Sequence, residues 1–310
     1  MKQKKQKKHR MKMSTGEKVF TTVNYIFLAS LFVVTLYPLI YVLSASFSDP
    51  VAVSSGKMVL WPIEPSLEGY EFVFKYKEIW TGYANTIFYT VVGTMLNLLF
   101  TLPAAYALGR KDMAGRGTIM VLFIITMYFS GGLIPTYLNM SSFGLVNNRG
   151  ALLFVGLVSA YNLIIARTFF ASSIPWELQE AAYLDGASTF KIFTKVVLPL
   201  SSPIIVVMAL YYGINHWNTY FNGMVYLRDR SLLPLQVILK EILTKSQLSA
   251  EALSNGAFTA EEIAEMQRMT ETANRMKYCV IVISAAPMLA IYPWLQKYFA
   301  KGTMIGSVKG

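Results

Sequence analysis

Polar side chains inside one apolar stretch are the first candidates for chemistry in this sequence. Residues 203–227 contain no Asp, Glu, Lys or Arg, yet Asn215, Trp217 and Asn218 lie close together in them. Amide groups form paired hydrogen bonds with hydroxyls, and an indole covers the apolar face of a sugar ring. These residues are therefore candidate contacts for a carbohydrate-like solute. Two other interpretations stay open, since asparagines often hold membrane helices together and tryptophan often anchors a helix end at the interface.

Residue types needed for metal binding or nucleophilic catalysis are scarce. The sequence has one cysteine, Cys279, and two distant histidines, His9 and His216. This excludes an intrachain disulfide, a thiolate cluster and a zinc-type ligand set, and no Ser/His/Asp-like set is within reach. The phosphate-binding pattern Gly-x-x-x-x-Gly-Lys-Ser/Thr does not occur either. We therefore predict no catalytic residue, no metal site and no cofactor bound by this chain.

The composition places most of the chain in a membrane. Of 310 residues, 54% are hydrophobic and only 15% are charged. Crossing the hydrocarbon core takes about 20 helical residues. Six stretches meet this requirement: 19–43, 84–108, 118–140, 151–171, 203–227 and 278–296. The first also resembles a secretory signal, but its apolar run exceeds the roughly 7–15 residues of one, so we interpret it as an uncleaved helix.

The basic residues predict how these helices are oriented. The net charge of +11 would suit a nucleic-acid partner if it were spread over a soluble surface. With the basic N-terminal tail inside, however, the inner side carries 17 basic and 5 acidic residues, and the outer side 11 and 12. This asymmetry follows the positive-inside rule. The sequence thus predicts an all-α polytopic membrane protein with six transmembrane helices and both termini cytoplasmic.

The predicted helices divide the chain into a basic tail (1–18), a transmembrane domain (19–298) and a C-terminal tail (299–310). Two outer loops cover about 44–83 and 228–277, and the second is helical in pattern from Thr259 onward. These loops are either docking surfaces or solvated spacers. Gly131, Gly132 and Pro135 predict a break in the third helix, which is either a hinge or pore-lining element or a site of close helix packing.

The inner loop at about 172–199 predicts a short helix outside the bilayer, over residues 176–185. Ser173 can cap it, Pro175 suits its first turn and Gly186 can end it. Residues at spacings of three and four share one face of this helix: Glu177, Glu180, Ala181 and Leu184. Small alanines allow another backbone to approach, and carboxylates can meet a basic partner. The pattern is typical of a helix that sits in a groove.

The same loop carries a resemblance to a known family. Glu180, Ala181 and Ala182, followed by Gly186 and then Leu198-Pro199, resemble the EAA signature of permease subunits of bacterial ATP-binding-cassette importers. Segments 129–137, 217–218 and 301–310 are similar to the carbohydrate-uptake branch of that family. Within the branch, the chain resembles the maltose-permease-type second subunit of the complex-oligosaccharide subgroup.

The resemblance implies a function and a set of partners. It implies a non-catalytic permease domain in a bacterial cytoplasmic membrane that works with a second homologous permease subunit, two ATPase subunits and an extracellular solute-binding protein. ATP and Mg²⁺ would bind to the ATPases. The resemblance also implies which residues meet the ATPases: Glu180, Ala181, Ala182, Asp185 and Gly186 in the loop, and Lys309 and Gly310 in the tail. The resemblance implies a carbohydrate solute, for which the polar residues considered first, Asn215, Trp217 and Asn218, are the candidate contacts.

Rival interpretations come from other classes of protein. An ion-coupled secondary transporter would normally carry buried carboxylates or histidines, whereas the predicted helices hold only His216. A membrane-embedded hydrolase lacks a catalytic set. The lysine-rich N-terminus has two interpretations, an arm that binds nucleic acid and an anchor on anionic lipid at the inner side of the membrane. The predicted topology favours the anchor.

Overall fold

The computed structural model describes residues 14–244 and 260–302, and within these ranges every regular element is a helix. The long helices are α1 (Thr15–Ser46), α4 (Lys77–Gly109), α12 (Ser202–Trp217) and α15 (Ala260–Gly302). Shorter helices connect them: α2 (Pro50–Ser54), α3 (Glu68–Lys75), α5 (Arg116–Tyr128), α6 (Leu133–Ser142), α7 (Arg149–Phe154), α8 (Ala160–Ser173), α9 (Trp176–Leu184), α10 (Thr189–Ile192), α11 (Leu198–Leu200) and α13 (Phe221–Tyr226). A π-helical turn, η1 (Phe193–Val197), a 3₁₀ turn, η2 (Arg230–Leu232), and a helix over 235–244 complete the described part.

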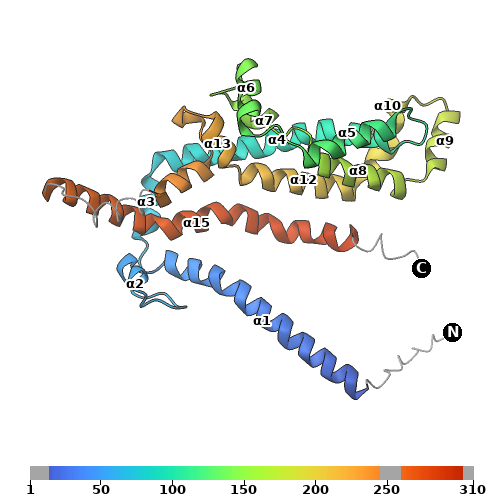
Figure 1. Cartoon of the computed structure of the whole chain (residues 1–310). Coiled ribbons are helices and arrows are strands. Elements are labelled where there is room, and N and C mark those ends of the chain that lie inside the picture. Colours follow the sequence, from blue (N-terminus) through green and yellow to red (C-terminus); the bar gives the residue numbers. More distant parts are fainter. Residues whose placement is uncertain (1–13, 245–259, 303–310) are drawn as a thin grey trace.

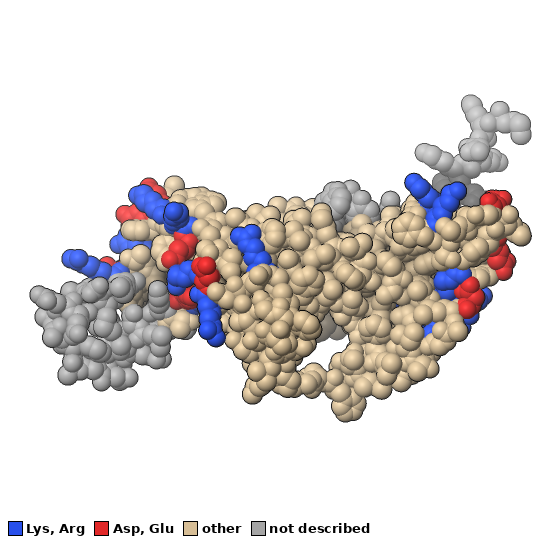
Figure 2. Space-filling model, turned by 90° about the horizontal axis from the view of Figure 1, so that it is seen from above, with Lys and Arg blue, Asp and Glu red and all other residues tan. Residues whose placement is uncertain are grey.

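The bundle is elongated, with α3 and α9 at opposite ends (Figure 1). Helix α4 packs along α12 and α8, and α15 runs beside α12. The start of α1 and the end of α15 both lie toward the α9 end. Charged side chains gather at the two ends of the face drawn in Figure 2, and most of the region between them carries none. This is the charge distribution expected of a bundle whose middle lies in hydrocarbon.

Three described helices are long and apolar enough to cross a membrane alone: α1, α4 and the Thr270–Pro293 part of α15. Two bent pairs could each form one further span. In the first pair, α5 and α6 meet at 116° across Phe129–Gly132, which confirms the break predicted at Gly131 and Gly132. In the second pair, 189–200 meets α12 at 83°.

The last span also begins earlier than expected, since Thr270 precedes the predicted start at 278 by eight residues.

The fourth and fifth predicted helices are not continuous. Residues 151–171 fall into α7 and α8, separated by five non-helical or turn residues, and α8 with its 14 residues is only about 21 Å long. The fifth stretch is broken between α12 and α13. Apolar composition predicted uninterrupted helices here, and that prediction was wrong. Between α7 and α8, side chains from other helices bind the freed backbone groups, as described below.

The two largest hydrophobic cores of the described residues lie within the bundle. One joins the second half of α4 to α5, α8, α10, η1 and α12. The other joins α3 and the first half of α4 to α15 and to residues 233–242. Leu235, Val237 and Ile238 are almost completely buried. The interpretation of 228–277 as a solvated spacer is therefore wrong for residues 233–242, which carry an apolar face against α4.

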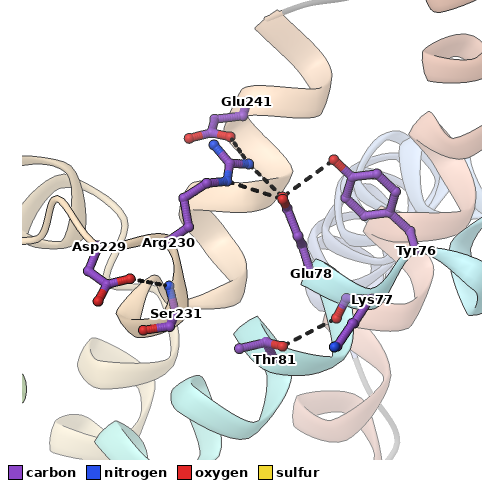
Figure 3. Close-up of polar contacts among 8 residues, drawn as sticks. All are labelled: Tyr76, Lys77, Glu78, Thr81, Asp229, Arg230, Ser231 and Glu241. Atoms are coloured by element: carbon purple, nitrogen blue, oxygen red, sulfur yellow. Dashed lines mark hydrogen bonds and ion pairs between the residues drawn. The ribbon is translucent and has the colours of Figure 1, made fainter.

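Polar contacts hold this buried segment at the α3 end. Asn85 donates from Nδ2 to the carbonyl oxygens of Ser231 and Leu233, at 2.7 and 3.1 Å. Arg230 forms ion pairs with Glu78 at the start of α4 and with Glu241, at 2.5 and 3.1 Å (Figure 3). Burial and the nearby Glu78 raise the pKa of the Tyr76 hydroxyl. We refer to Glu78, Arg230 and Glu241 as the α3-end cluster.

Candidate functional site

Helix α9 forms as the sequence predicts but starts differently. Pro175 is its N-cap residue, with no side-chain cap, whereas Ser173 is the last residue of α8, so the capping role expected of Ser173 is wrong. At the other end, Gly186 has φ +74°, and its N–H donates to the carbonyl oxygen of Tyr183 at 2.9 Å. Glycine adopts this left-handed conformation without steric cost, so the predicted stop at Gly186 is confirmed. Ser188 then caps α10 through the N–H of Lys191.

The face of α9 with the candidate coupling residues is open to solvent. Glu177, Glu180, Ala181 and Leu184 are all exposed, and Leu184 is 90% exposed. Asp185 and Gly186 are exposed at the end of the helix, whereas Ala182 is half-buried against the neighbouring core. Within the part of the chain that the structure describes, Glu177 and Glu180 have neither a hydrogen bond nor an ion pair through their side chains. A large apolar side chain and free carboxylates on one small helix make a surface suited to a partner protein.

The opposite face of α9 is attached to the bundle. Gln179 is its one buried residue, and its Oε1 accepts a hydrogen bond of 2.8 Å from the hydroxyl of Tyr106 in α4. The ring of Tyr106 stacks on Phe193, with centroids 5.0 Å apart. The sequence motif singled out the exposed face of α9 but gave no indication that Gln179 and Tyr106 meet, since they are 73 residues apart.

Lys309 and Gly310, the tail residues expected to meet the ATPases, lie outside the described residues. The lysine-rich start of the N-terminal tail, through position 13, also lies outside them.

A groove of 580 Å³ between α12 and α15 contains part of the predicted solute path. Its lining includes Trp217 and Asn218, and it also includes Gln236, Ser284 and Tyr292. The indole of Trp217 is buried, and its Nε1 donates to the carbonyl oxygen of Ser284 at 3.2 Å. The edge of Trp217 is thus fixed to α15. Gln236 is a groove residue that sequence analysis assigned to an outer loop; the apolar spacing of residues 233–242 was the signal that could have placed it.

Asn215 and Asn218 differ in their surroundings. Asn218 lines the groove, and its Nδ2 donates to the carbonyl oxygen of Ile214 in its own helix at 2.9 Å. Asn215 is exposed and does not line the groove. The structure therefore brings Trp217 and Asn218 together at one groove and leaves Asn215 outside it.

Another set of polar residues binds the broken backbone between α7 and α8. Asn97 of α4 donates to the carbonyl oxygen of Leu157 and, through Oδ1, pairs with Nε2 of His216, both at 2.7 Å. The hydroxyl of Tyr212 accepts from the N–H of Ser159 at 3.2 Å. Irregular backbone at membrane depth requires such partners, because hydrocarbon offers none. Asn97 and His216 are thus buried structural groups.

This combination of apolar helices, an interrupted central bundle and an exposed helix at one end defines a helical membrane component. The family described as binding-protein-dependent transport system inner membrane component matches residues 79–230. Protein LplC of Bacillus subtilis (strain 168) is 37% identical over 302 residues, covering 97% of this chain and 99% of that protein. The chain belongs to this family of inner membrane transport components.

Two further similarities extend over nearly the whole chain. The polygalacturonan/rhamnogalacturonan transport system permease protein YtcP of the same organism is 37% identical, covering 94% of this chain and 99% of that protein. In the crystal structure of a bacterial ABC transporter involved in the import of the acidic polysaccharide alginate, one chain matches with a TM-score of 0.81 and 35% identity. That match covers 93% of this chain and 99% of the other. The resemblance to permeases of ATP-binding-cassette transporters is thus confirmed.

Proposed function

We propose that this chain is the permease subunit of an importer that moves oligosaccharides across the cytoplasmic membrane. The observation that carries the proposal is similarity over nearly the full length to a permease of a polygalacturonan/rhamnogalacturonan system and to a chain of an alginate importer. The arabinooligosaccharides transport system permease protein AraQ of Halalkalibacterium halodurans, 26% identical over 93% of this chain, supports the same substrate class. The chain crosses the membrane six times, with both termini inside, and performs no catalysis itself.

Energy reaches the chain through α9. The exposed face with Glu180, Ala181 and Leu184 sits in a cleft of an ATPase subunit, and Asp185 and Gly186 lie at the rim of the same contact. Lys309 and Gly310 in the tail meet the ATPases as well. ATP and Mg²⁺ bind to those partners. Closure of two ATPases moves α9, and rigid helices carry this motion to the far side as opening. The exposure of α9 at one end of the bundle supports this arrangement.

Solute passes between this chain and a second, homologous permease after delivery by an extracellular binding protein. In this proposal the indole face of Trp217 and the amides of Asn215 and Asn218 contact the sugar. The groove beside Trp217 and Asn218 supports a role for these two residues. Asn215 would contact solute from the exposed side of α12.

The test is transport by the complete complex, purified with its partner subunits and reconstituted into liposomes. We expect uptake of labelled oligogalacturonate that requires binding protein and ATP and is unaffected by an ionophore. A neutral arabino-oligosaccharide tests the substrate class in parallel. Uptake that continues without ATP and collapses with an ionophore would contradict the proposal and support ion-coupled transport, which the absence of Asp and Glu from residues 84–108 and 203–227 disfavours.

A further inference from the structure

Arg110 occupies an unusual position at the end of α4. It is the C-cap residue of that helix, and its side chain is only 10% exposed. Its guanidinium carbon lies 5.7, 5.5 and 5.4 Å from the ring centroids of Tyr106, Trp176 and Tyr183. Tyr106 belongs to α4, whereas Trp176 lies in the first turn of α9 and Tyr183 near its end. One cation therefore contacts aromatic rings at both ends of α9.

Hydrogen bonds add to these ring contacts, and together we call them the Arg110 joint. Arg110 donates from Nη1 to the Tyr106 hydroxyl at 3.1 Å, and that hydroxyl donates to Gln179 at 2.8 Å. Arg110 also forms a two-point ion pair with Asp112, with Nε 2.9 Å from Oδ1, and this pairing lowers the pKa of the Asp112 carboxyl. The carbonyl oxygen of Arg110 accepts from Nη1 of Arg116 at the start of α5. The end of α4, both ends of α9 and the start of α5 thus meet at one residue, Arg110.

A planar guanidinium suits this position. It has five donors in a fixed plane and can contact rings and hydrogen-bond acceptors simultaneously, whereas the ammonium of lysine is compact and strongly hydrated. The contact also matters mechanically. Only Ile174 and Pro175 separate α9 from α8, and only residues 185–188 separate it from α10. Without a side-chain joint, α9 could tilt on these short connections while α4 stays still.

We propose that Arg110 is a positioning residue that fastens α9 to α4, so that movement of α9 is transmitted to α4. Helix α4 then carries the movement about 50 Å to the α3 end, where Glu78 joins Arg230 (Figure 3). This inference rests on the proposed function, because it assumes that an ATPase moves α9. It assigns to Arg110 a role that depends on the shape of its side chain as well as on its charge.

The test compares three variants in the complete reconstituted transporter: Arg110→Gln, Arg110→Lys and Lys111→Gln. Lys111→Gln is the matched control, because Lys111 is adjacent and exposed, and has no side-chain partner in the described part of the chain. Three quantities are measured: the amount of ATPase that co-purifies, ATP hydrolysis, and solute molecules imported per ATP hydrolysed. We expect normal co-purification for all three variants.

The number of solute molecules imported per ATP should fall about fivefold or more in Arg110→Gln. It should also fall in Arg110→Lys and stay unchanged in Lys111→Gln. An unchanged import-to-ATP ratio in Arg110→Gln would overturn the inference, as would a loss of transport that follows loss of complex in proportion.

If Arg110→Gln does not accumulate in cells, the number of solute molecules imported per ATP is measured for Tyr106→Phe instead. This variant keeps the ring and removes the hydrogen bonds of the hydroxyl with Arg110 and Gln179. A lower ratio in Tyr106→Phe supports the joint, and an unchanged ratio overturns it. Failure of the proposed function is distinguishable from either result, because wild-type liposomes would then show no ATP-driven uptake.

Discussion

At the scale of single residues, two glycines occupy positions that other side chains fit poorly, for different reasons. Gly186 has φ +74° with no atom near its missing Cβ, so its constraint is conformational. A Cβ on Gly93 would lie 2.5 Å from the His216 ring, so its constraint is space. The first position shapes the exposed helix end, and the second sets how closely α4 approaches α12. Substitutions at the two glycines should therefore affect different properties.

Gly186→Val should impair energy coupling. A β-branched residue in the left-handed region costs about 1–2 kcal/mol, which would displace the end of α9 and lower uptake by roughly tenfold. Gly186→Asn is the control, because asparagine tolerates this conformation. Uptake and co-purification of the ATPase are measured for both. Wild-type uptake by an assembled Gly186→Val transporter would show that this end of α9 takes no part in coupling.

Gly93→Ala should destabilise the bundle. The His216 ring cannot retreat without breaking its 2.7 Å hydrogen bond with Asn97, so overpacking should cost about 1–3 kcal/mol and exceed the gain in helix propensity. The measurement is the thermal unfolding midpoint in detergent. Gly117→Ala is the control, since no atom lies within 4 Å of that Cβ position. Equal midpoints for the two variants would contradict the predicted clash.

At the scale of elements, the interruptions of the apolar helices are built in two ways. Between α5 and α6 the local sequence makes the break: Gly132 has φ +83° and ψ −178°, a backbone conformation that favours glycine strongly. Between α7 and α8 the break depends on Asn97 and Tyr212, which come from other helices. A local break can be recognised in the sequence, whereas one supported from a distance cannot.

Gly132→Ala should therefore disturb the bent pair α5–α6. Strain of about 1–3 kcal/mol would favour a straighter connection, and we expect a lower unfolding midpoint and reduced uptake. The neighbouring Gly131→Ala is a close control, since its Cβ would make only an ordinary 3.7 Å contact with Pro135. If both variants behave alike, the conformation of Gly132 does not maintain the bend.

Asn97→Leu should weaken the break between α7 and α8. It removes the donor to the Leu157 carbonyl and leaves His216 without its partner, which should cost about 1–3 kcal/mol. The unfolding midpoint in detergent is compared with that of Asn218→Leu, because the Asn218 side chain bonds among the described residues to the carbonyl oxygen of Ile214 in the same helix. A smaller loss for Asn97→Leu than for Asn218→Leu would contradict the assigned structural role.

At the scale of the whole molecule, the two ends are fixed by different kinds of contact. At the α9 end, a nearly buried guanidinium lies among aromatic rings. At the α3 end, the cluster of Glu78, Arg230 and Glu241 is about half exposed and lies above the apolar packing of residues 233–242. Because exposed ion pairs are screened, the α3-end cluster should contribute less to stability than the apolar core beneath it.

Arg230→Gln should accordingly have a small, salt-dependent effect. At low ionic strength we expect the free energy of unfolding, measured in detergent, to fall by at most about 1 kcal/mol. At about 1 M salt the variant and the wild type should have the same free energy of unfolding. Lys240→Gln removes the same charge from the same segment, and Lys240 has no ion pair among the described residues. A large loss that persists in high salt would mean that Arg230 orders the segment by geometry rather than by charge.

The sequence by itself determined the features that depend on local physics. Apolar length predicted the membrane character, the EAA spacing predicted the family, and Gly186 and Gly132 marked a helix end and a break. In each case the neighbouring residues are sufficient, because backbone conformation and hydropathy act over a few positions. The exposed face of α9 also followed from helical spacing alone.

Only the tertiary structure decided which distant residues meet. Arg110 and Tyr106 reach Trp176, Gln179 and Tyr183 across more than 60 residues of chain. Residues 233–242 are buried because α4 and α15 present apolar surface to them, although their place in the sequence suggested a loop. The fourth predicted helix is interrupted because polar side chains of α4 and α12 satisfy its backbone. Such choices depend on which groups are brought together in hydrocarbon, where every polar group needs a partner, and composition does not encode that pairing.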